Sequence, residues 1–179
     1  MQFVNILLIL FISLIIVLVV IKLFFNHKRI ETQIVIHQPI QRVWQHFQCV
    51  SAYHEWNRLF NIDAFPSHAV QHMQVDLYGE NKKILMRMNV RVLNNTFGHL
   101  VWEGKLLING LFNGKHQFKL EAIDSNSTRF IQTEDFNGIL VPFLNSFVIQ
   151  PTQVKFELMN QSFKHYVEDD PLDLVLPEQ

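Results

Sequence analysis

Two residues with complementary acid–base chemistry, His116 and Glu134, lie in strand-like segments that flank one turn. With the turn at residues 125–127, side-chain alternation predicts a hairpin that pairs Phe118 with Glu134 and His116 with Phe136. His116 and Glu134 then share an interior face, one pair apart, where imidazole and carboxylate can act as general acid and base. We prefer a plainer interpretation, in which each side chain satisfies a backbone or water contact at a cavity rim. The two residues are therefore weak catalytic candidates.

Metal ligation is the other chemistry that nine histidines and one cysteine suggest, but their spacing argues against it. No predicted helix carries two histidines four residues apart, and a Cys-x-x-Cys pair is absent from the sequence. His68 and His72 have that spacing, but in a predicted turn or strand start. Cys49 ends an amphipathic segment beside Val50, which predicts a buried structural thiol and not a nucleophile. The sequence predicts no metal site and no cofactor.

The composition of the 179-residue chain favours an apolar interior and a neutral surface. Fifteen basic and 16 acidic residues nearly balance, and nucleic acid needs a basic surface, so we expect no nucleic-acid partner. Phenylalanine occurs 16 times, against three Trp and three Tyr. Because Phe fills apolar volume without a polar group to satisfy, the excess favours a large core or a lined cavity.

Residues 3–25 form one apolar run, interrupted by Asn5, Ser13 and Lys22. At ~1.5 Å per residue, a helix of this length crosses a ~30 Å hydrocarbon core. A cleaved signal peptide is the alternative, but it needs a basic start, a shorter apolar stretch and a small-residue cleavage site. The sequence shows none of these features here. We therefore predict a transmembrane anchor.

The positive charges nearest the anchor, Lys22, Lys28 and Arg29, lie towards or beyond its C-terminal end, and none precedes it. The positive-inside rule then places the N-terminus outside and the following domain in the cytoplasm. We expect a single-pass protein of the bacterial inner (plasma) membrane, with a cytoplasmic C-terminal domain.

Alternation and turn signals after the anchor predict one strand, two helices, six strands and one long helix. The predicted strands span residues 31–37, 62–65, 71–78, 84–93, 97–103, 114–123 and 128–136. The predicted domains are a transmembrane anchor at 1–26, a short basic linker at 27–30, a folded domain at 31–168 and an acidic flexible tail at 169–179.

The last long apolar segment, residues 138–167, predicts a helix that packs against the sheet. Pro151 lies inside it and should kink it, because proline removes a backbone donor. We expect the apolar half before Pro151 to contact a ligand, and the half after it to pack against the sheet. The predicted ligand contacts in the first half are Leu140, Phe143, Leu144 and Phe147.

The soluble part resembles the SRPBCC (START / birch-pollen-allergen-like helix-grip) superfamily and its polyketide cyclase/dehydrase-like family. The resemblance covers residues 31–168 and rests on the element order and on these segments: 35–44 (VIHQPIQRVW), 53–60 (YHEWNRLF), 102–104 (WEG), 110–118 (GLFNGKHQF), 128–138 (TRFIQTEDFNG) and 156–160 (FELMN). It implies an α+β helix-grip fold, with a curved antiparallel sheet of about seven strands around a long C-terminal helix. The anchor is not part of that common domain.

The resemblance also implies a cavity between the sheet and the C-terminal helix that holds hydrophobic or lipid-like ligands. Together with the alternation pattern, it leads us to expect these residues at the ligand: Trp44, Phe47, Met86, Met88, Trp102, Phe112, His116, Phe118, Phe130, Glu134, Phe136, Leu140, Phe143, Leu144 and Phe147.

Three functions remain open at this point. The first is a membrane-anchored binding module for a small hydrophobic or lipid-like ligand. The second is a cyclase/dehydrase-type enzyme that uses His116 and Glu134. The third is an accessory protein of a membrane complex, similar to an accessory protein of carbon monoxide dehydrogenase, with a protein partner that the sequence does not identify. We rank the binding module first.

Overall fold

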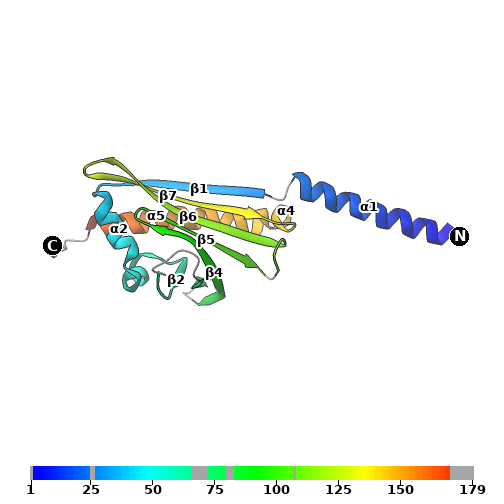
Figure 1. The fold of residues 1–179 in the computed structure, drawn as a ribbon, viewed down its shortest axis with the longest axis horizontal. Helices are drawn as coiled ribbons and strands as arrows, with labels where there is room; N and C mark the ends of the chain where they lie inside the picture. Colours follow the sequence, from blue (N-terminus) through cyan, green and yellow to red (C-terminus); the bar gives the residue numbers. More distant parts are fainter. Residues whose placement is uncertain (1, 25–26, 66–71, 80–82, 107, 170–179) are drawn as a thin grey trace.

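The computed structural model describes residues 2–24, 27–65, 72–79, 83–106 and 108–169. An N-terminal helix is followed by a seven-stranded antiparallel sheet and a long C-terminal helix (Figure 1). The strands lie in the order β1-β7-β6-β5-β4-β3-β2. The elements are α1 (Gln2–Phe24), β1 (His27–Ile36), α2 (Ile40–Gln48), η1 (Val50–Ala52), α3 (Tyr53–Trp56), β2 (Phe60–Ile62), β3 (His72–Tyr78), β4 (Ile84–Thr96), β5 (His99–Leu106), β6 (Phe112–Asp124), β7 (Ser127–Asn137), α4 (Val141–Leu144), η3 (Asn145–Ile149) and α5 (Gln150–Asp169).

The predicted fold class is confirmed: one strand, two short helices, six further strands and the C-terminal helix follow in the expected order. Residues 27–30 differ from the expected linker, because they form the start of β1 and pair with residues 134–137 of β7. Their extended backbone finds hydrogen-bond partners there, and Ile30 is buried on the core side. Two residues therefore separate the end of α1 from the start of the sheet.

Helix α1 is long and apolar enough to cross a membrane. Its segment Gln2–Val20 has a mean hydropathy of 3.3, and none of that segment is buried against the rest of the protein. A helix that is apolar on all sides and packs against nothing needs an apolar surrounding. By length and composition, α1 fits a bilayer.

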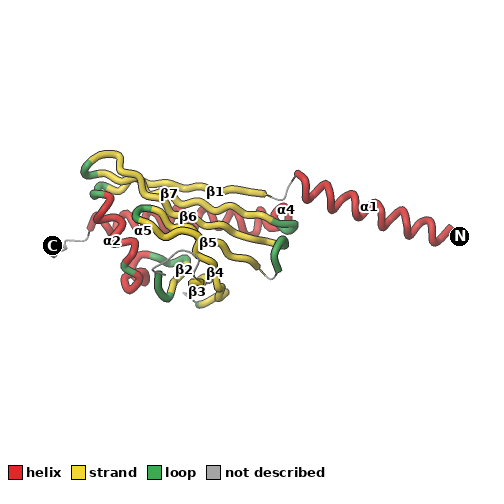
Figure 2. The backbone as a smooth tube through the Cα atoms, viewed as in Figure 1, coloured by secondary structure: helices red, strands yellow, loops and turns green. Residues whose placement is uncertain are grey.

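Helix α5 covers one face of the sheet, as Figure 2 shows. Phe156, Met159, Phe163 and Val167 lie on its buried side, at the three- and four-residue spacing of one helical face. Asn160 on the same side donates a buried hydrogen bond of 2.9 Å to the Thr32 hydroxyl of β1. These contacts fix the helix against the sheet.

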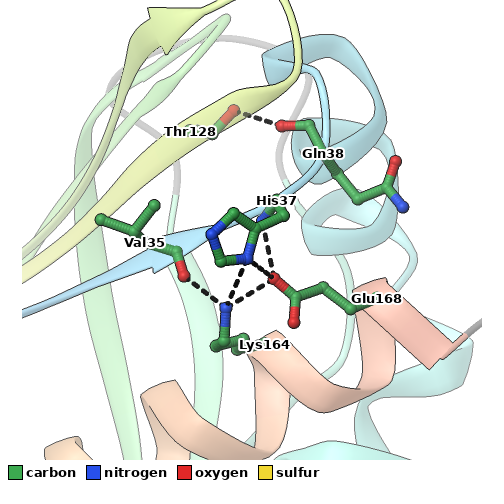
Figure 3. A network of polar contacts seen from close by, with 6 residues as sticks. All are labelled: Val35, His37, Gln38, Thr128, Lys164 and Glu168. Carbon is green, nitrogen blue, oxygen red and sulfur yellow. Dashed lines mark hydrogen bonds and ion pairs between the residues drawn. The ribbon is translucent and has the colours of Figure 1, made fainter.

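The C-terminal end of α5 is held by a polar network (Figure 3). The Glu168 carboxylate accepts hydrogen bonds from the His37 backbone N–H at 2.6 Å and from Lys164 Nζ at 2.6 Å. Lys164 also donates to the Val35 carbonyl at 2.7 Å. Burial acts to raise the pKa of Glu168, but the bonds from His37 and Lys164 outweigh it and hold that pKa below its usual value.

The C-terminal helix is interrupted before Pro151. A short helix α4 leads into one π-helical turn, η3, in which the Gln150 backbone N–H bonds the Asn145 carbonyl five residues back. Pro151 has no N–H, and its ring crowds the carbonyl four residues earlier, so a regular α-helix cannot continue through it. The Thr152 hydroxyl instead donates to the Val148 carbonyl at 2.7 Å. Where the sequence predicts a kink at Pro151, the structure has a π-helical turn over the five residues before Gln150.

Candidate functional site

A cavity of about 390 Å³ lies between the sheet and the C-terminal helix. Most of its wall is apolar, and the polar groups are few. The lining residues are Leu59, Phe60, Val75, Leu77, Tyr78, Leu85, Met86, Met88, Val90, Trp102, Gly104, Lys105, Phe112, Gly114, His116, Glu134, Phe136, Leu144, Phe147, Val148, Pro151, Thr152, Lys155 and Phe156. Pockets for small organic ligands have this size and character.

One end of the cavity is closed by packed aromatic rings. The Phe47 ring of α2 lies 4.9 Å from Phe118, 5.8 Å from Phe130 and 6.0 Å from Phe163, measured between ring centroids. Trp44 stacks on Phe47 from the outside at 5.6 Å. Phe47, Phe118 and Phe130 therefore lie in the core, and Trp44 is partly buried against it. None of these four residues, all expected at the ligand, lies on the cavity wall.

A second, smaller hydrophobic core lies between the sheet and the segment from α4 to α5. It joins Ile30 of β1, Phe112, Phe136, Val141, Ile149 and Phe156, with Leu140 packed against it. Phe112 and Phe136 stack at 5.3 Å and also contribute to the cavity wall. Leu140 belongs to this core and Phe143 is exposed, so neither lines the cavity as expected.

His116 and Glu134 face each other directly across β6 and β7. The predicted register was wrong by two residues, since Phe118 pairs with Gln132 and Gly114 pairs with Phe136. A tighter turn explains the difference: Asp124 pairs with Ser127, and the ladder shifts between Ala122 and Asp124. Direct pairing brings His116 Nδ1 to 2.6 Å from Glu134 Oε2.

The surroundings of His116 fix the orientation of its ring. It is buried and stacks on Trp102 at 4.8 Å and on Phe118 at 4.4 Å, while Phe156 packs at 4.9 Å from α5. Gln132 Nε2 lies 3.1 Å from His116 Nε2. With this amide donating to Nε2, the neutral imidazole carries its proton on Nδ1 and donates it to the Glu134 carboxylate. Both ring nitrogens are therefore engaged by protein groups.

Gly114 makes room for the Glu134 carboxylate. A Cβ atom built on Gly114 would overlap Glu134 Oε1, so no larger residue fits there without moving the carboxylate. Gly114 is the residue beside His116 on the same face of β6, two positions earlier. Glu134 thus holds His116 with one oxygen and sets the other against the glycine at the cavity wall.

The cavity mouth is lined by exposed apolar and basic side chains. Leu85 of β4 and Phe147 of η3 are exposed although both line the cavity. Lys105 of β5 and Lys155 of α5 are exposed lining residues too. Neither lysine forms an ion pair with another described residue. The mouth therefore combines an apolar surface with two positive charges.

Nine of the 15 residues expected at the ligand line the cavity: Met86, Met88, Trp102, Phe112, His116, Glu134, Phe136, Leu144 and Phe147. Sequence reasoning missed the contribution of β3, although Val75 and Leu77 alternate with polar residues on one face. It also missed Pro151, Thr152, Lys155 and Phe156, because the half after Pro151 was expected to be ordinary packing. The π-helical turn Asn145–Ile149 precedes these residues and adds one residue to a helical turn.

Two other expectations concern cysteine and metals. Cys49 is exposed, not buried as predicted, and forms the C-cap of α2. Its Sγ lies 3.4 Å from the Ser51 hydroxyl. Among the described residues, no cluster of three or more His, Cys, Asp or Glu side chains could hold a metal ion. His68 lies outside the described residues.

Comparison with solved structures identifies the architecture. A hypothetical protein from Helicobacter pylori superposes with a TM-score of 0.64 at 14% identity, covering 78% of this chain and 88% of that one. Norcoclaurine synthase from Thalictrum flavum, in complex with dopamine and hydroxybenzaldehyde, gives 0.61 at 8% identity, covering 82% and 90%. An aromatase/cyclase from a Streptomyces species gives 0.55 at 9% identity, covering 79% and 96%.

These structures share the helix-grip fold, so the resemblance to the SRPBCC superfamily is confirmed at the level of the fold. A scan against protein-family models finds no match, and a search of curated proteins finds none either. Fold alone does not assign an activity, since one fold supports many functions. The chemistry of the cavity is therefore the basis for a function.

Proposed function

We propose that this protein is a membrane-anchored binding module that holds a small hydrophobic or lipid-like ligand between the sheet and the C-terminal helix. The observation that carries this proposal is the cavity of about 390 Å³, which is walled by Met, Phe, Leu and Val side chains. Removing an apolar ligand from water stabilises the complex by about 25 cal/mol per Å² of buried apolar surface. Flexible methionines at Met86 and Met88 let such a wall fit guests of different shape.

The Glu134 carboxylate gives this wall one strong hydrogen-bond acceptor. One of its oxygens accepts from His116, and the other lies at the wall beside Gly114. A half-buried carboxylate in an apolar wall favours a ligand that brings a donor, such as a hydroxyl or an amine. We therefore propose a ligand with an apolar body and one hydrogen-bond donor, in contact with Met86, Met88, Trp102, Phe136 and Phe147 among the lining residues.

Helix α1 is proposed as the anchor, with the domain on the cytoplasmic side of the membrane. The support for anchoring is the length, apolarity and exposure of Gln2–Val20. The support for the side is the position of Lys22, Lys28 and Arg29 at and beyond the C-terminal end of the apolar run, following the positive-inside rule.

Native mass spectrometry of the full chain, purified in mild detergent, tests ligand binding. Lipids held by α1 are common to all variants, so the comparison is between the wild type, Met88→Trp and Val154→Trp. Met88 lines the cavity and an indole there fills it, whereas Val154 lies exposed on α5 outside the lining. We expect a bound mass in the wild type and Val154→Trp that is lost in Met88→Trp. Equal spectra for all three proteins would contradict the proposal.

A second candidate, an enzyme of the cyclase or dehydrase type, is favoured by one observation: the 2.6 Å contact between His116 and Glu134 at the cavity wall. Because both nitrogens of His116 are engaged, Glu134 would act as the base towards the ligand and His116 would position it. Structures of this fold include an aromatase/cyclase and norcoclaurine synthase.

The extracted ligand distinguishes the two functions. A dehydrase would return the ligand lighter by one water, and a cyclase that closes a ring without losing water would return an isomer with a changed chromatographic retention. Glu134→Gln would bind the ligand but leave both its mass and its retention unchanged. A binding module returns the ligand with mass and retention unchanged in the wild type as well.

A further inference from the structure

Three large apolar side chains are exposed around the start of the C-terminal helix. Phe147 in η3 is 83% exposed, Phe143 in α4 is 59% exposed and Ile108, before β6, is 64% exposed. We call these three residues the apolar rim. Scattered apolar residues are normal on a protein surface, but neighbouring aromatic ones mark a contact with another apolar body.

Backbone hydrogen bonds hold the apolar rim at one end of the sheet. The Ile139 N–H donates to the Gly110 carbonyl at 3.1 Å, and the Leu140 N–H donates to the Leu111 carbonyl at 3.0 Å. These bonds join the turn that carries Ile108 to the segment that leads into α4. Phe143 and Phe147 follow on that segment, four residues apart, so they project from neighbouring turns of the same helix.

The same end of the sheet is the one at which the chain arrives from α1. His27, the first residue of β1, pairs with Asn137, the last residue of β7, just before the segment to α4. Figure 1 shows α4 beside the end of β1 that follows α1. Two residues separate Phe24 from His27, so their Cα atoms lie within about 11 Å of each other even when fully extended. An inserted α1 therefore keeps this end of the domain close to the bilayer surface.

The cavity mouth shares the apolar rim. Phe147 belongs to the apolar rim and also lines the cavity, and the next turns of the helix contribute Val148, Pro151 and Lys155 to the wall. Lys105 at the end of β5 and Lys155 are exposed, and neither pairs with a described acidic residue. The two ammonium groups can pair with lipid phosphates at the membrane surface. The apolar side chains beside them can then insert below the level of the phosphates.

We propose that the apolar rim inserts into the bilayer that holds α1, so that the cavity mouth opens against the membrane and exchanges its ligand with it directly. The inference rests on the proposed membrane anchoring and ligand binding. An interfacial apolar face buries its side chains about 5–10 Å into the headgroup region, a depth that Phe143 and Phe147 can reach. A hydrophobic ligand then passes between lipid and cavity without crossing water.

A second copy of the chain is the competing occupant of the apolar rim. The bilayer is favoured because α1 tethers this end of the domain, and no comparable link brings a second copy to it. The two lysines also match lipid phosphates, whereas two identical surfaces would bring like charges together. The test must therefore distinguish contact with lipid from contact with protein.

The test uses the full chain with Cys49→Ser, reconstituted into phosphatidylcholine–phosphatidylglycerol nanodiscs at one copy per disc. Single cysteines are introduced at Phe147, Ile108, Ser125 or Ser13 and labelled with an environment-sensitive fluorophore. Quenching by acyl-chain nitroxide lipids is then measured. Ser125 lies in the exposed turn between β6 and β7, at the other end of that hairpin from Asn137, and serves as the control for a soluble surface. Ser13 lies within α1 and reports insertion of the anchor.

We expect strong quenching at positions 13, 147 and 108 and none at 125. Quenching at 13 with none at 147 and 108 would overturn membrane docking while leaving the anchor intact. An unquenched label at 13 would refute the anchor on which docking depends. Ligand retention, measured separately by native mass spectrometry, reports the proposed binding function whichever result is obtained.

Discussion

The Glu134 carboxylate is positioned by three neighbouring residues, each for a physical reason. His116 donates to it at 2.6 Å, Gln132 fixes the far side of the imidazole, and Gly114 leaves the space it occupies. Trp102 and Phe118 stack on the imidazole and keep its plane fixed. The pair therefore presents a carboxylate oxygen to a cavity whose wall is mostly apolar.

Replacing Gly114 with Ala should destabilise the protein by moving this carboxylate. The new Cβ would overlap Glu134 Oε1, and the buried His116 N–H would lose its acceptor, at a cost of about 1–3 kcal/mol. Urea unfolding followed by tryptophan fluorescence measures the change. Gly79→Ala is the matched control, because a Cβ there meets Leu85 at an ordinary 3.6 Å. Equal stability of the two variants would show that Glu134 is not held against Gly114.

At the scale of elements, helix α5 separates a packed region from an open one. Its C-terminal part buries Phe163 against Phe47, Phe130 and Trp56, and its N-terminal part lines the cavity through Lys155 and Phe156. The π-helical turn before Pro151 marks the change between α4 and this long helix. We expect the packed C-terminal part of α5 to provide stability and the N-terminal part to contribute to ligand binding.

Truncation of two apolar residues on α5 should separate these regions. Phe163 is fully buried among aromatic rings, so Phe163→Ala should cost about 3–5 kcal/mol in the free energy of unfolding. Leu158 is exposed on the same helix, so Leu158→Ala should change it by less than about 0.5 kcal/mol. Chemical denaturation of both variants measures the difference, and similar losses would contradict the described packing of α5.

The polar network of Glu168, His37 and Lys164 at the C-terminal end of α5 should make stability depend on pH. The pKa of Glu168 is lowered in the folded state, so its contribution is present above its unfolded pKa and is lost as the pH falls through the folded pKa. Glu168→Gln should therefore cost about 1 kcal/mol at neutral pH and progressively less below the ordinary carboxyl pKa of 4.5. The midpoint of thermal unfolding, followed against pH, measures this. Glu157→Gln, an exposed change on the same helix, should leave the profile unchanged.

Alternation and helical spacing were sufficient to predict the element order, because buried residues recur mainly at every second position in β3, β6 and β7 and at every third or fourth position in α5. The register of β6 and β7 was not predictable, since it depends on a ladder shift at Ala122 that has no distinct sequence signal. The same limit applies to the site. Phe47, Phe118 and Phe130 are as apolar as Phe136, and packing under α2, which is a tertiary effect, decides that they fill the core.

At the scale of the whole molecule, an apolar helix, a cavity and an apolar rim follow one another at one end of the sheet. The chain leaves α1 at Phe24, enters β1 at His27, and returns through β7 to α4 beside it. This arrangement places the proposed membrane side and the cavity mouth together. The other end of β1 leads into His37, where Glu168 binds the backbone N–H, and into α2, which covers the packed aromatic core.

The side of the membrane can be tested with the native cysteine. Cys49 is the single cysteine and is exposed at the end of α2, so a membrane-impermeant maleimide should label it wherever the domain is accessible. We expect no labelling in intact, wall-free cells and complete labelling after permeabilisation, since the proposed domain is cytoplasmic. Labelling of intact cells would place the domain outside and reverse the proposed orientation.

The most direct test of the central claim locates the ligand by photochemical crosslinking. The full chain is placed in nanodiscs containing a long-chain alcohol with a diazirine at the end of its tail, and crosslinked peptides are mapped by mass spectrometry. We predict adducts on the peptides that contain Met86, Met88 and Phe136, with their loss in Met88→Trp and their retention in Val154→Trp. Adducts on α1 should persist in all three proteins. Adducts confined to α1 in the wild type would contradict a ligand-binding cavity.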